Sequence, residues 1–269
     1  VQHLAGKTRG LRLEEFLAVN EAGVDRLCAA AVRTTTPPVV VVVSSLAVVG
    51  PSPPGEPHTE STPCRPISMY GRSKLAGEHA ARRHADRLPI SIVRPPVVFG
   101  PGDRAGLMLF KTIRRLGFHF VPQMQGLPLS AVYADDLVDA LIRVGESGER
   151  CHAGDELEPD DPRGVYFAGS PEPTSYADIG RMAAAALGQK AWVLCRRKYP
   201  LLPAAWAGDI YGRITGKAPL LGTDKLREAS ASGWVCRSDK LSALGWAPSK
   251  PLAEQYAATA DWYRHAGWL

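Results

Sequence analysis

The stretch Val39-Val40-Val41-Val42-Val43-Ser44-Ser45 decides the fold of this chain. Five valines in a row, without polar alternation, predict a strand that is covered on both faces, and such strands are typically parallel. The two serines stand where this strand ends, at the carboxyl edge where open α/β sheets bind their ligands. They either cap the following turn or present hydroxyl groups to a ligand, and the stretch alone leaves both interpretations open.

Segments of helical and strand pattern alternate on both sides of this strand. Upstream, residues 1–6 are typical of the end of a buried strand, and apolar residues recur at helical spacing over 13–32. Downstream we expect helices at about 70–85 and 107–115, a strand at 90–93, a stiff proline-bearing loop at 94–103, an extended segment at 129–133, and a helix for which Asp135 and Asp136 supply N-cap and first-turn charges. This alternation predicts an α/β fold with a Rossmann-like parallel sheet.

A polar tract from Gly145 to Gly164 separates this sheet from a smaller C-terminal lobe. In the lobe we expect a strand near 165–168, which could return to the sheet, and an amphipathic helix at about 175–187. A final packed helix follows the segment Leu244-Gly245-Trp246-Ala247-Pro248.

Composition narrows the class of protein. Of the 269 residues 45% are apolar and 22% charged, which is ordinary for a soluble globular protein, and no stretch is long enough to cross a bilayer. Five cysteines without metal-ligand spacing are typical of reduced cytosolic thiols, so we expect no metal. The formal charge of +5 looks spread along the chain, and its tight cluster Arg196-Arg197-Lys198 is more typical of a solvated surface than of a nucleic-acid site. We therefore expect a cytoplasmic protein with neither nucleic acid nor membrane as a partner.

The segment Tyr70-Gly71-Arg72-Ser73-Lys74 carries a phenol and an ammonium group four residues apart, on one face of a helix. A lysine there can stabilise a tyrosinate and lower the pKa of the phenol, as general acid–base chemistry requires. Ser45, at the end of the valine strand, could hydrogen-bond the same substrate oxygen. A Tyr-x3-Lys pattern occurs by chance in roughly one chain in four of this composition, so its surroundings decide its meaning.

Several motifs, taken in order, resemble those of the extended short-chain dehydrogenase/reductase superfamily, in its NAD-dependent epimerase/dehydratase group. They are His3 to Gly6, similar to the cofactor segment of the fourth strand; Phe16 to Gly23, similar to the Asn-x-x-Gly helix motif; Ser44 to Gly50, similar to the strand of the catalytic serine; Tyr70 to Lys74; Arg94 to Asp103, with Phe99 where Tyr is usual; Ser130 to Leu137; and the Leu-Gly-Trp-x-Pro ending. The resemblance covers nearly the whole chain.

The resemblance implies a role for each matching residue. Tyr70 would be the general acid–base, Lys74 would lower its pKa and bind the nicotinamide ribose, and Ser45 would hold the substrate oxygen. The cofactor, NAD or NADP, would be lined by Ala5, Gly6, Asn20, Ser44, Tyr70, Lys74 and the backbone of Pro95, Pro96 and Val97. From its pattern alone, Asn20 could also be an ordinary exposed residue in the middle of a helix. The resemblance further implies a homodimer formed through the Asn20 and Tyr70 helices.

Three departures qualify the resemblance. The glycine-rich loop is absent with the first three strands, so we expect an N-terminally truncated fragment that binds a dinucleotide poorly and is inactive and prone to aggregate. Residues 1–150 would be the C-terminal half of a dinucleotide-binding Rossmann domain and 151–269 mainly a substrate-binding lobe. Leu46-Ala47 replaces the Asp-Glu pair of sugar-nucleotide dehydratases, and Val97 replaces the Asn common in nucleotide-sugar epimerases.

These departures favour an NAD(P)-dependent oxidoreductase that interconverts a secondary alcohol and a ketone. The substrate would be a small hydroxy or keto compound. Two alternatives remain: a nucleotide-sugar epimerase of the same family, and a non-catalytic cofactor-binding protein or inactive fragment.

Overall fold

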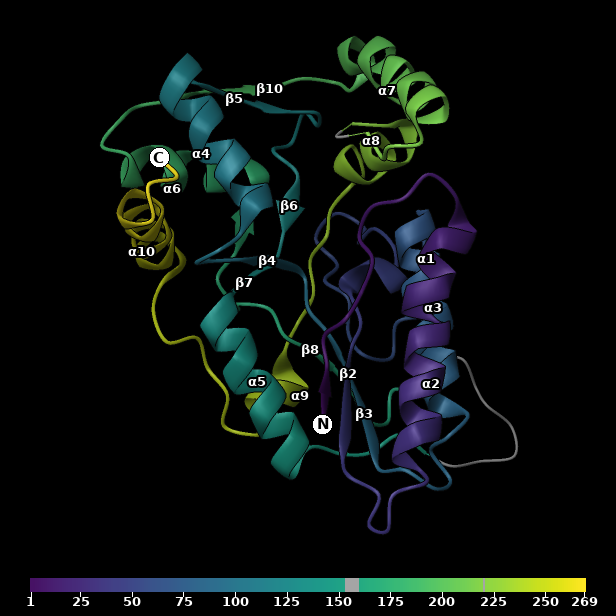
Figure 1. Cartoon of the computed structure of the whole chain (residues 1–269). Helices are drawn as coiled ribbons and strands as arrows, with labels where there is room; N and C mark the ends of the chain where they lie inside the picture. Colours follow the sequence, from purple (N-terminus) through teal and green to yellow (C-terminus); the bar gives the residue numbers. More distant parts are fainter. Residues whose placement is uncertain (153–159, 220) are drawn as a thin grey trace.

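A four-stranded parallel sheet forms the centre of the molecule (Figure 1). The computed structural model describes residues 1–152, 160–219 and 221–269; residues 153–159 of the polar tract lie outside this part. The strand order is β1 (Gln2–His3), β2 (Val40–Val43), β3 (Ile90–Arg94) and β8 (Val165–Phe167), and all three pairings are parallel. The α/β class and the parallel sheet are therefore confirmed, and the strand near 165–168 does return to the sheet, beside β3.

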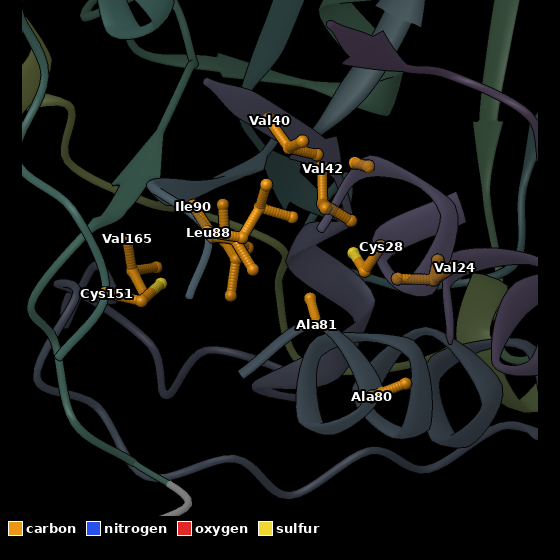
Figure 2. Close-up of a cluster of buried hydrophobic side chains, with 12 residues drawn as sticks. Val24, Cys28, Val40, Val42, Ala80, Ala81, Leu88, Ile90, Cys151 and Val165 are labelled. Carbon is orange, nitrogen blue, oxygen red and sulfur yellow. The ribbon is translucent and has the colours of Figure 1, made fainter. Parts of the chain in front are cut away.

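The valine strand is covered from both sides, as its unbroken apolar sequence predicts. Val40, Val42 and Ile90 face Cys28 and Ala81 of the helices on one side (Figure 2). On this side lie α1 (Leu13–Asn20), α2 (Ala22–Ala31) and α3 (Met69–Arg82), whereas α5 (Ala134–Ser147) packs on the opposite face together with Val41 and Val93. Because successive side chains of a strand point to opposite faces, five valines serve both interfaces.

The C-terminal lobe is built from segments on both sides of residue 150. A single core cluster joins α4 (Arg104–Leu116), α6 (Tyr176–Ala186) and α10 (Leu252–His265). Three small strand pairs support it: β5 (Phe118–Val121) with β10 (Trp192–Cys195), β4 (Val97–Phe99) with β7 (Ala131–Tyr133), and β6 (Pro128–Leu129) with β9 (Thr174–Ser175). The remaining elements are η1 (Leu46–Val48), η2 (Tyr199–Leu201), α7 (Leu202–Thr215), α8 (Thr223–Ala229) and α9 (Asp239–Ser242).

Three expectations about local structure are wrong. The single helix expected over 13–32 is two helices with a break at Glu21, where ψ is −65° and the φ of −101° departs from helical values. The stiff loop after β3 contains β4, because Val97 to Phe99 find a partner strand in β7. The first strand is half-exposed rather than buried, because β1 lies at the edge of the sheet.

Asp136 has a role beyond the one expected. Both aspartates lie in the first turn of α5, as expected, but its N-cap is Tyr133 and Asp136 also makes tertiary hydrogen bonds. The buried carboxylate of Asp136 accepts hydrogen bonds from the Ser249 backbone N–H (3.0 Å) and from Gln255 Nε2 (2.5 Å). It therefore anchors the C-terminal segment onto α5.

Gly77 allows α3 to touch α1, and we expect Gly77→Ala to lower the free energy of unfolding by about 1–3 kcal/mol. A Cβ at this position would lie 2.2 Å from the backbone oxygen of Asn20, so one helix would have to move. Gly23→Ala is the matched control, because no atom lies within 4 Å of its added Cβ. That variant should be neutral or more stable by up to about 1 kcal/mol. Urea unfolding measures both, and equal effects would contradict the close approach.

Candidate active site

The predicted site residues gather at the carboxyl edge of the sheet. Because β1, β2 and β3 are parallel, the segments that follow them emerge at the same edge, which brings Gly6, Ser45 and Pro95 to one side of the molecule. The backbone N–H of Leu46 donates to the carbonyl oxygen of Pro95 at 2.9 Å and ties the exits of β2 and β3 together. Pro95 is buried, Pro96 is half-buried and Val97 is exposed at the start of β4.

The start of α3 places Tyr70 beside Ser45. Ser68 caps the helix by accepting a hydrogen bond from the Gly71 N–H at 3.0 Å, so Tyr70 lies in the first turn. Gly71 lets this turn approach η1, since a Cβ there would lie 2.5 Å from the carbonyl oxygen of Ala47. As a result, the Ser45 hydroxyl lies close enough to the Tyr70 phenol to influence its pKa.

The electrostatics of Tyr70 differ from the expected pattern. Burial raises the pKa of the phenol, the neighbouring Ser45 hydroxyl lowers it, and the negative charge of Glu228 raises it further, with a net upward shift. We expected Lys74 to lower this pKa. Instead, the Lys74 ammonium donates a hydrogen bond of 2.6 Å to the carbonyl oxygen of Val43. Tyr70 is therefore a protonated phenol at neutral pH.

Lys74 is buried at the carboxyl end of β2, and burial lowers its pKa to about 8, with Glu78 opposing the shift. At neutral pH its ammonium is still charged. The Lys74 charge also contributes, after burial, to lowering the pKa of His3 on the edge strand. Lys74 therefore places a positive charge between β1, β2 and α3.

We expect Lys74→Met to raise the free energy of unfolding at pH 7 by up to about 3 kcal/mol, because a lysine pKa of about 8 in place of 10.5 means that folding disfavours the charged form. Between pH 8 and 10.5 the unfolded chain binds more protons than the folded chain, so the wild type gains stability as pH rises. The advantage of the Met variant should therefore shrink across this window. Urea unfolding at a series of pH values tests this, with the exposed Lys111→Met as control. An advantage that stays constant with pH would contradict the shift.

Gly6 lies beside Asn20 and Lys74 after the end of β1. A Cβ on Gly6 would lie 3.4 Å from both Asn20 Oδ1 and Lys74 Nζ, so this glycine leaves room where a side chain would stand. The Nε2 atom of His3 is buried nearby without a hydrogen-bond partner among the described residues. A glycine beside an ammonium group fits the ribose and phosphate oxygens of a dinucleotide, since it offers a close backbone approach and positive charge.

The Asn20 amide is more occupied than the sequence predicts. It is buried, its Oδ1 accepts from the Lys7 N–H at 2.7 Å, and its Nδ2 donates to the Lys7 carbonyl oxygen (2.9 Å) and to Ser73 Oγ (2.8 Å). It is not an exposed mid-helix residue. These bonds make Asn20 a positioning residue that holds the loop after β1 against α3.

Ser44 belongs to a buried ionic network that sequence analysis missed. Its hydroxyl donates to Glu78, whose carboxylate accepts two further bonds from Arg94, Nε to Oε1 at 2.9 Å and Nη2 to Oε2 at 2.7 Å. Arg94 also donates to Cys64 Sγ at 3.2 Å and lies over the ring of Phe167. Burial alone would raise the pKa of Glu78, but Arg94 and Ser44 hold it below its usual range. The Ser44 hydroxyl is thus committed to structure, and only its backbone can line a ligand.

A signal for this network was present in the sequence. Glu78 follows Lys74 by four residues and Tyr70 by eight, so all three share one face of α3. Arg94 ends a buried strand, where a charged side chain needs a partner. Glu228 was also missed, and no local pattern could have found it, because α8 is far from α3 in the sequence.

The helix α8 covers the first turn of α3. Asp224 accepts a hydrogen bond from the Met69 N–H at 3.2 Å, and Arg227 Nη1 donates to the Ile67 carbonyl oxygen at 3.1 Å. Together with the effect of Glu228 on the phenol, these contacts place the C-terminal lobe over Tyr70.

The chain is similar in sequence to several curated relatives. The chain is 30% identical to a ceramide reductase of Caulobacter vibrioides over 274 residues, covering 99% of this chain and 74% of the relative. It is 26% identical to a UDP-glucose 4-epimerase of Vibrio cholerae over 207 residues, covering 75% of this chain and 55% of that relative. A dTDP-D-glucose 4,6-dehydratase of Mus musculus is 24% identical over 98% of this chain and 67% of its own length.

Solved structures confirm the fold. A UDP-glucuronic acid 4-epimerase from Bacillus cereus, in complex with UDP-glucuronic acid and NAD, has a TM-score of 0.72 and 19% identity, covering 98% of this chain and 74% of its own. A dTDP-glucose 4,6-dehydratase from Bacillus anthracis, in complex with NAD, gives 0.73 and 16% identity, with coverage of 99% and 73%. At these identities the likeness shows the Rossmann-like architecture alone.

The family model for the NAD dependent epimerase/dehydratase family matches residues 1–157, which is more than half of the chain. This match, together with the ceramide reductase relative, confirms the resemblance that the motifs indicate and names NAD as the cofactor of the family. The chain belongs to the NAD dependent epimerase/dehydratase family.

Proposed function

We propose that this chain is an NAD(P)-dependent oxidoreductase that interconverts a ketone and a secondary alcohol. The observation that supports the proposal is that Ser45 lies beside the Tyr70 phenol, while Lys74, on the same face of α3, is held at the carboxyl end of β2 by the Val43 carbonyl oxygen. Proton transfer to a carbonyl oxygen needs a hydroxyl group that holds the oxygen, an acid placed to donate the proton, and a fixed positive charge.

In the direction of reduction, Tyr70 donates its proton to the carbonyl oxygen of the substrate. The raised pKa of the phenol keeps this proton in place at neutral pH. Ser45, beside the same phenol, orients the oxygen between the two hydroxyl groups. Lys74 is protonated below about pH 8, is held by the Val43 carbonyl oxygen and would bind the ribose of the cofactor. In the direction of oxidation the same groups take the proton back.

The nicotinamide cofactor, when bound, supplies or accepts the hydride. The residues that would hold it are those after the end of β1, with Gly6 giving room and Lys74 a positive charge. Asn20 would keep the loop after β1 in place, and the backbones of Ala5, Ser44 and Pro95 to Val97 would line the rest of the sheet edge.

Reduction is favoured over the other reactions of the family. The ceramide reductase relative, aligned over nearly the whole chain, supports ketone reduction on a lipid-like substrate. Dehydration needs a further acid and base, and the position after Ser45 is occupied by Leu46, which is buried in the core beside Val48 and Phe167. Epimerisation of a nucleotide sugar is the second candidate, because the chain is also similar to the UDP-glucose 4-epimerase of Vibrio cholerae.

The test is an assay of the full-length protein with NADH or NADPH and two substrates in parallel. With the keto form of a ceramide, the cofactor should be oxidised in proportion to the alcohol formed, and UDP-glucose should cause no change. Conversion of UDP-glucose to its epimer without net cofactor consumption would replace the proposal by the epimerase. Cofactor binding without turnover of either substrate would leave a non-catalytic binding protein.

A further inference from the structure

The helix α7 presents its large apolar side chains to solvent and its small residues to the protein. Trp206, Ile210 and Ile214 follow one another at four-residue spacing on the outward face and are 58%, 57% and 78% exposed. The packed face carries Gly208 and Gly212, where an added Cβ would lie 2.0 Å from the Leu221 carbonyl oxygen and 2.6 Å from Leu11 Cδ2, respectively. A surface helix of a soluble protein normally has the reverse polarity, so this outward face is suited to an apolar environment.

Positive charge is concentrated in the part of the sequence that contains α7. Residues 190–217 contain six Lys or Arg and one Asp, so the net charge of this segment, +5, equals the formal charge of the whole chain. The charge is therefore not spread evenly along the chain, contrary to expectation. The single acid, Asp209, accepts a hydrogen bond from Thr223 Oγ1 at 2.6 Å and so points towards α8. The basic residues are Lys190, Arg196, Arg197, Lys198, Arg213 and Lys217.

We propose that α7 docks on the surface of an anionic phospholipid bilayer, with Trp206, Ile210 and Ile214 at the boundary between headgroups and acyl chains. An apolar helix face bearing Trp, flanked by Lys and Arg, is the combination that binds such a surface. A nucleic acid would use the charges but not the apolar row. In residues 1–152, 160–219 and 221–269 no helix is long and apolar enough to cross a membrane, and surface docking requires none.

The docking face lies next to the candidate active site. The helix α7 is followed by α8 (Figure 1). In α8, Asp224 accepts a hydrogen bond from Met69 at the start of α3, and Arg227 donates one to Ile67 just before it. A bilayer bound at α7 would therefore lie near Tyr70, with α8 between them. This inference rests on the proposed function in one respect, that the ketone substrate is an amphipathic lipid taken from that bilayer.

Vesicle flotation of the full chain, without cofactor or substrate, tests the docking. The chain should float with phosphatidylcholine vesicles that contain phosphatidylglycerol, and high salt should release most of it. The variant Trp206→Ser/Ile210→Ser/Ile214→Ser should bind about tenfold more weakly. The control Val138→Ser/Ile142→Ser, on the exposed side of α5, should float like the wild type. Circular dichroism establishes that both variants are folded.

Three results would overturn the proposal. They are failure of the chain to float, equal flotation of the α7 variant and the wild type, and a solution dimer that the α7 variant converts to a monomer. The last result would mean that a second copy of the chain covers this face. Activity on a detergent-dispersed ketone without vesicle binding would overturn docking alone, whereas vesicle binding without reductase activity would overturn only the proposed function.

Discussion

Tyr70→Phe is expected to lower kcat for ketone reduction by about 10²- to 10⁴-fold, the usual contribution of a positioned general acid. The substitution removes only the hydroxyl that lies beside Ser45, and the ring continues to pack at the start of α3. Steady-state kinetics with NADH or NADPH measure the loss, and urea unfolding verifies that stability is kept.

A matched control removes the same atom elsewhere. Tyr133→Phe deletes a phenol hydroxyl at the N-cap of α5, outside the set of groups that we assign to proton transfer, and should leave kcat within a factor of about two. If Tyr70→Phe retained full activity, the mechanism would have no acid and the proposed function would fall with it.

Glu78→Gln is expected to lower the free energy of unfolding by about 3–5 kcal/mol, because it leaves the Arg94 charge buried without a counter-charge. Removing both partners, as in Glu78→Leu/Arg94→Met, should cost less than the single change, since no unpaired charge remains. Asp139→Asn breaks the exposed pair with Arg143 and should cost no more than about 1 kcal/mol. Urea unfolding at pH 7 ranks the three variants.

The same network predicts an acid dependence. Because folding lowers the Glu78 pKa, its contribution to stability is present above the ordinary value of 4.5 and is lost as pH falls below it. The Gln variant has no such titration, so the gap between it and the wild type should narrow as pH falls. A gap that stays constant, or a double variant less stable than Glu78→Gln, would contradict a buried ion pair of this kind.

The elements that sequence analysis located correctly are those with local signals. The valine strand must be covered on both faces by other elements, whatever its place in the sheet. The helix of Tyr70 and Lys74 begins at Ser68, a residue type that favours the N-cap position. The meeting of Ser45 with Tyr70 follows from the same logic, because strand ends and the first turn of a crossover helix share one edge of a parallel sheet. The chemical roles of these residues remain predictions.

The features that sequence analysis missed depend on contacts between distant segments. The break at Glu21 and the occupied amide of Asn20 arise where Gly77 lets α3 approach α1. The strand β4 pairs with β7, although the sequence of each segment is typical of the end of a loop. The outward apolar face of α7 has helical periodicity, and only the packing of Gly208 and Gly212 shows which side of the helix is buried.

The central claim is that hydride passes between the cofactor and the substrate carbon with Tyr70 as the proton donor. Deuterium labelling at the reactive position of NADH or NADPH tests it most directly. We expect an alcohol product that carries one deuterium from the cofactor per turnover, and almost no such product from Tyr70→Phe. Epimerised substrate that carries no deuterium from the added cofactor, or an unchanged yield of labelled alcohol from the Phe variant, would contradict it.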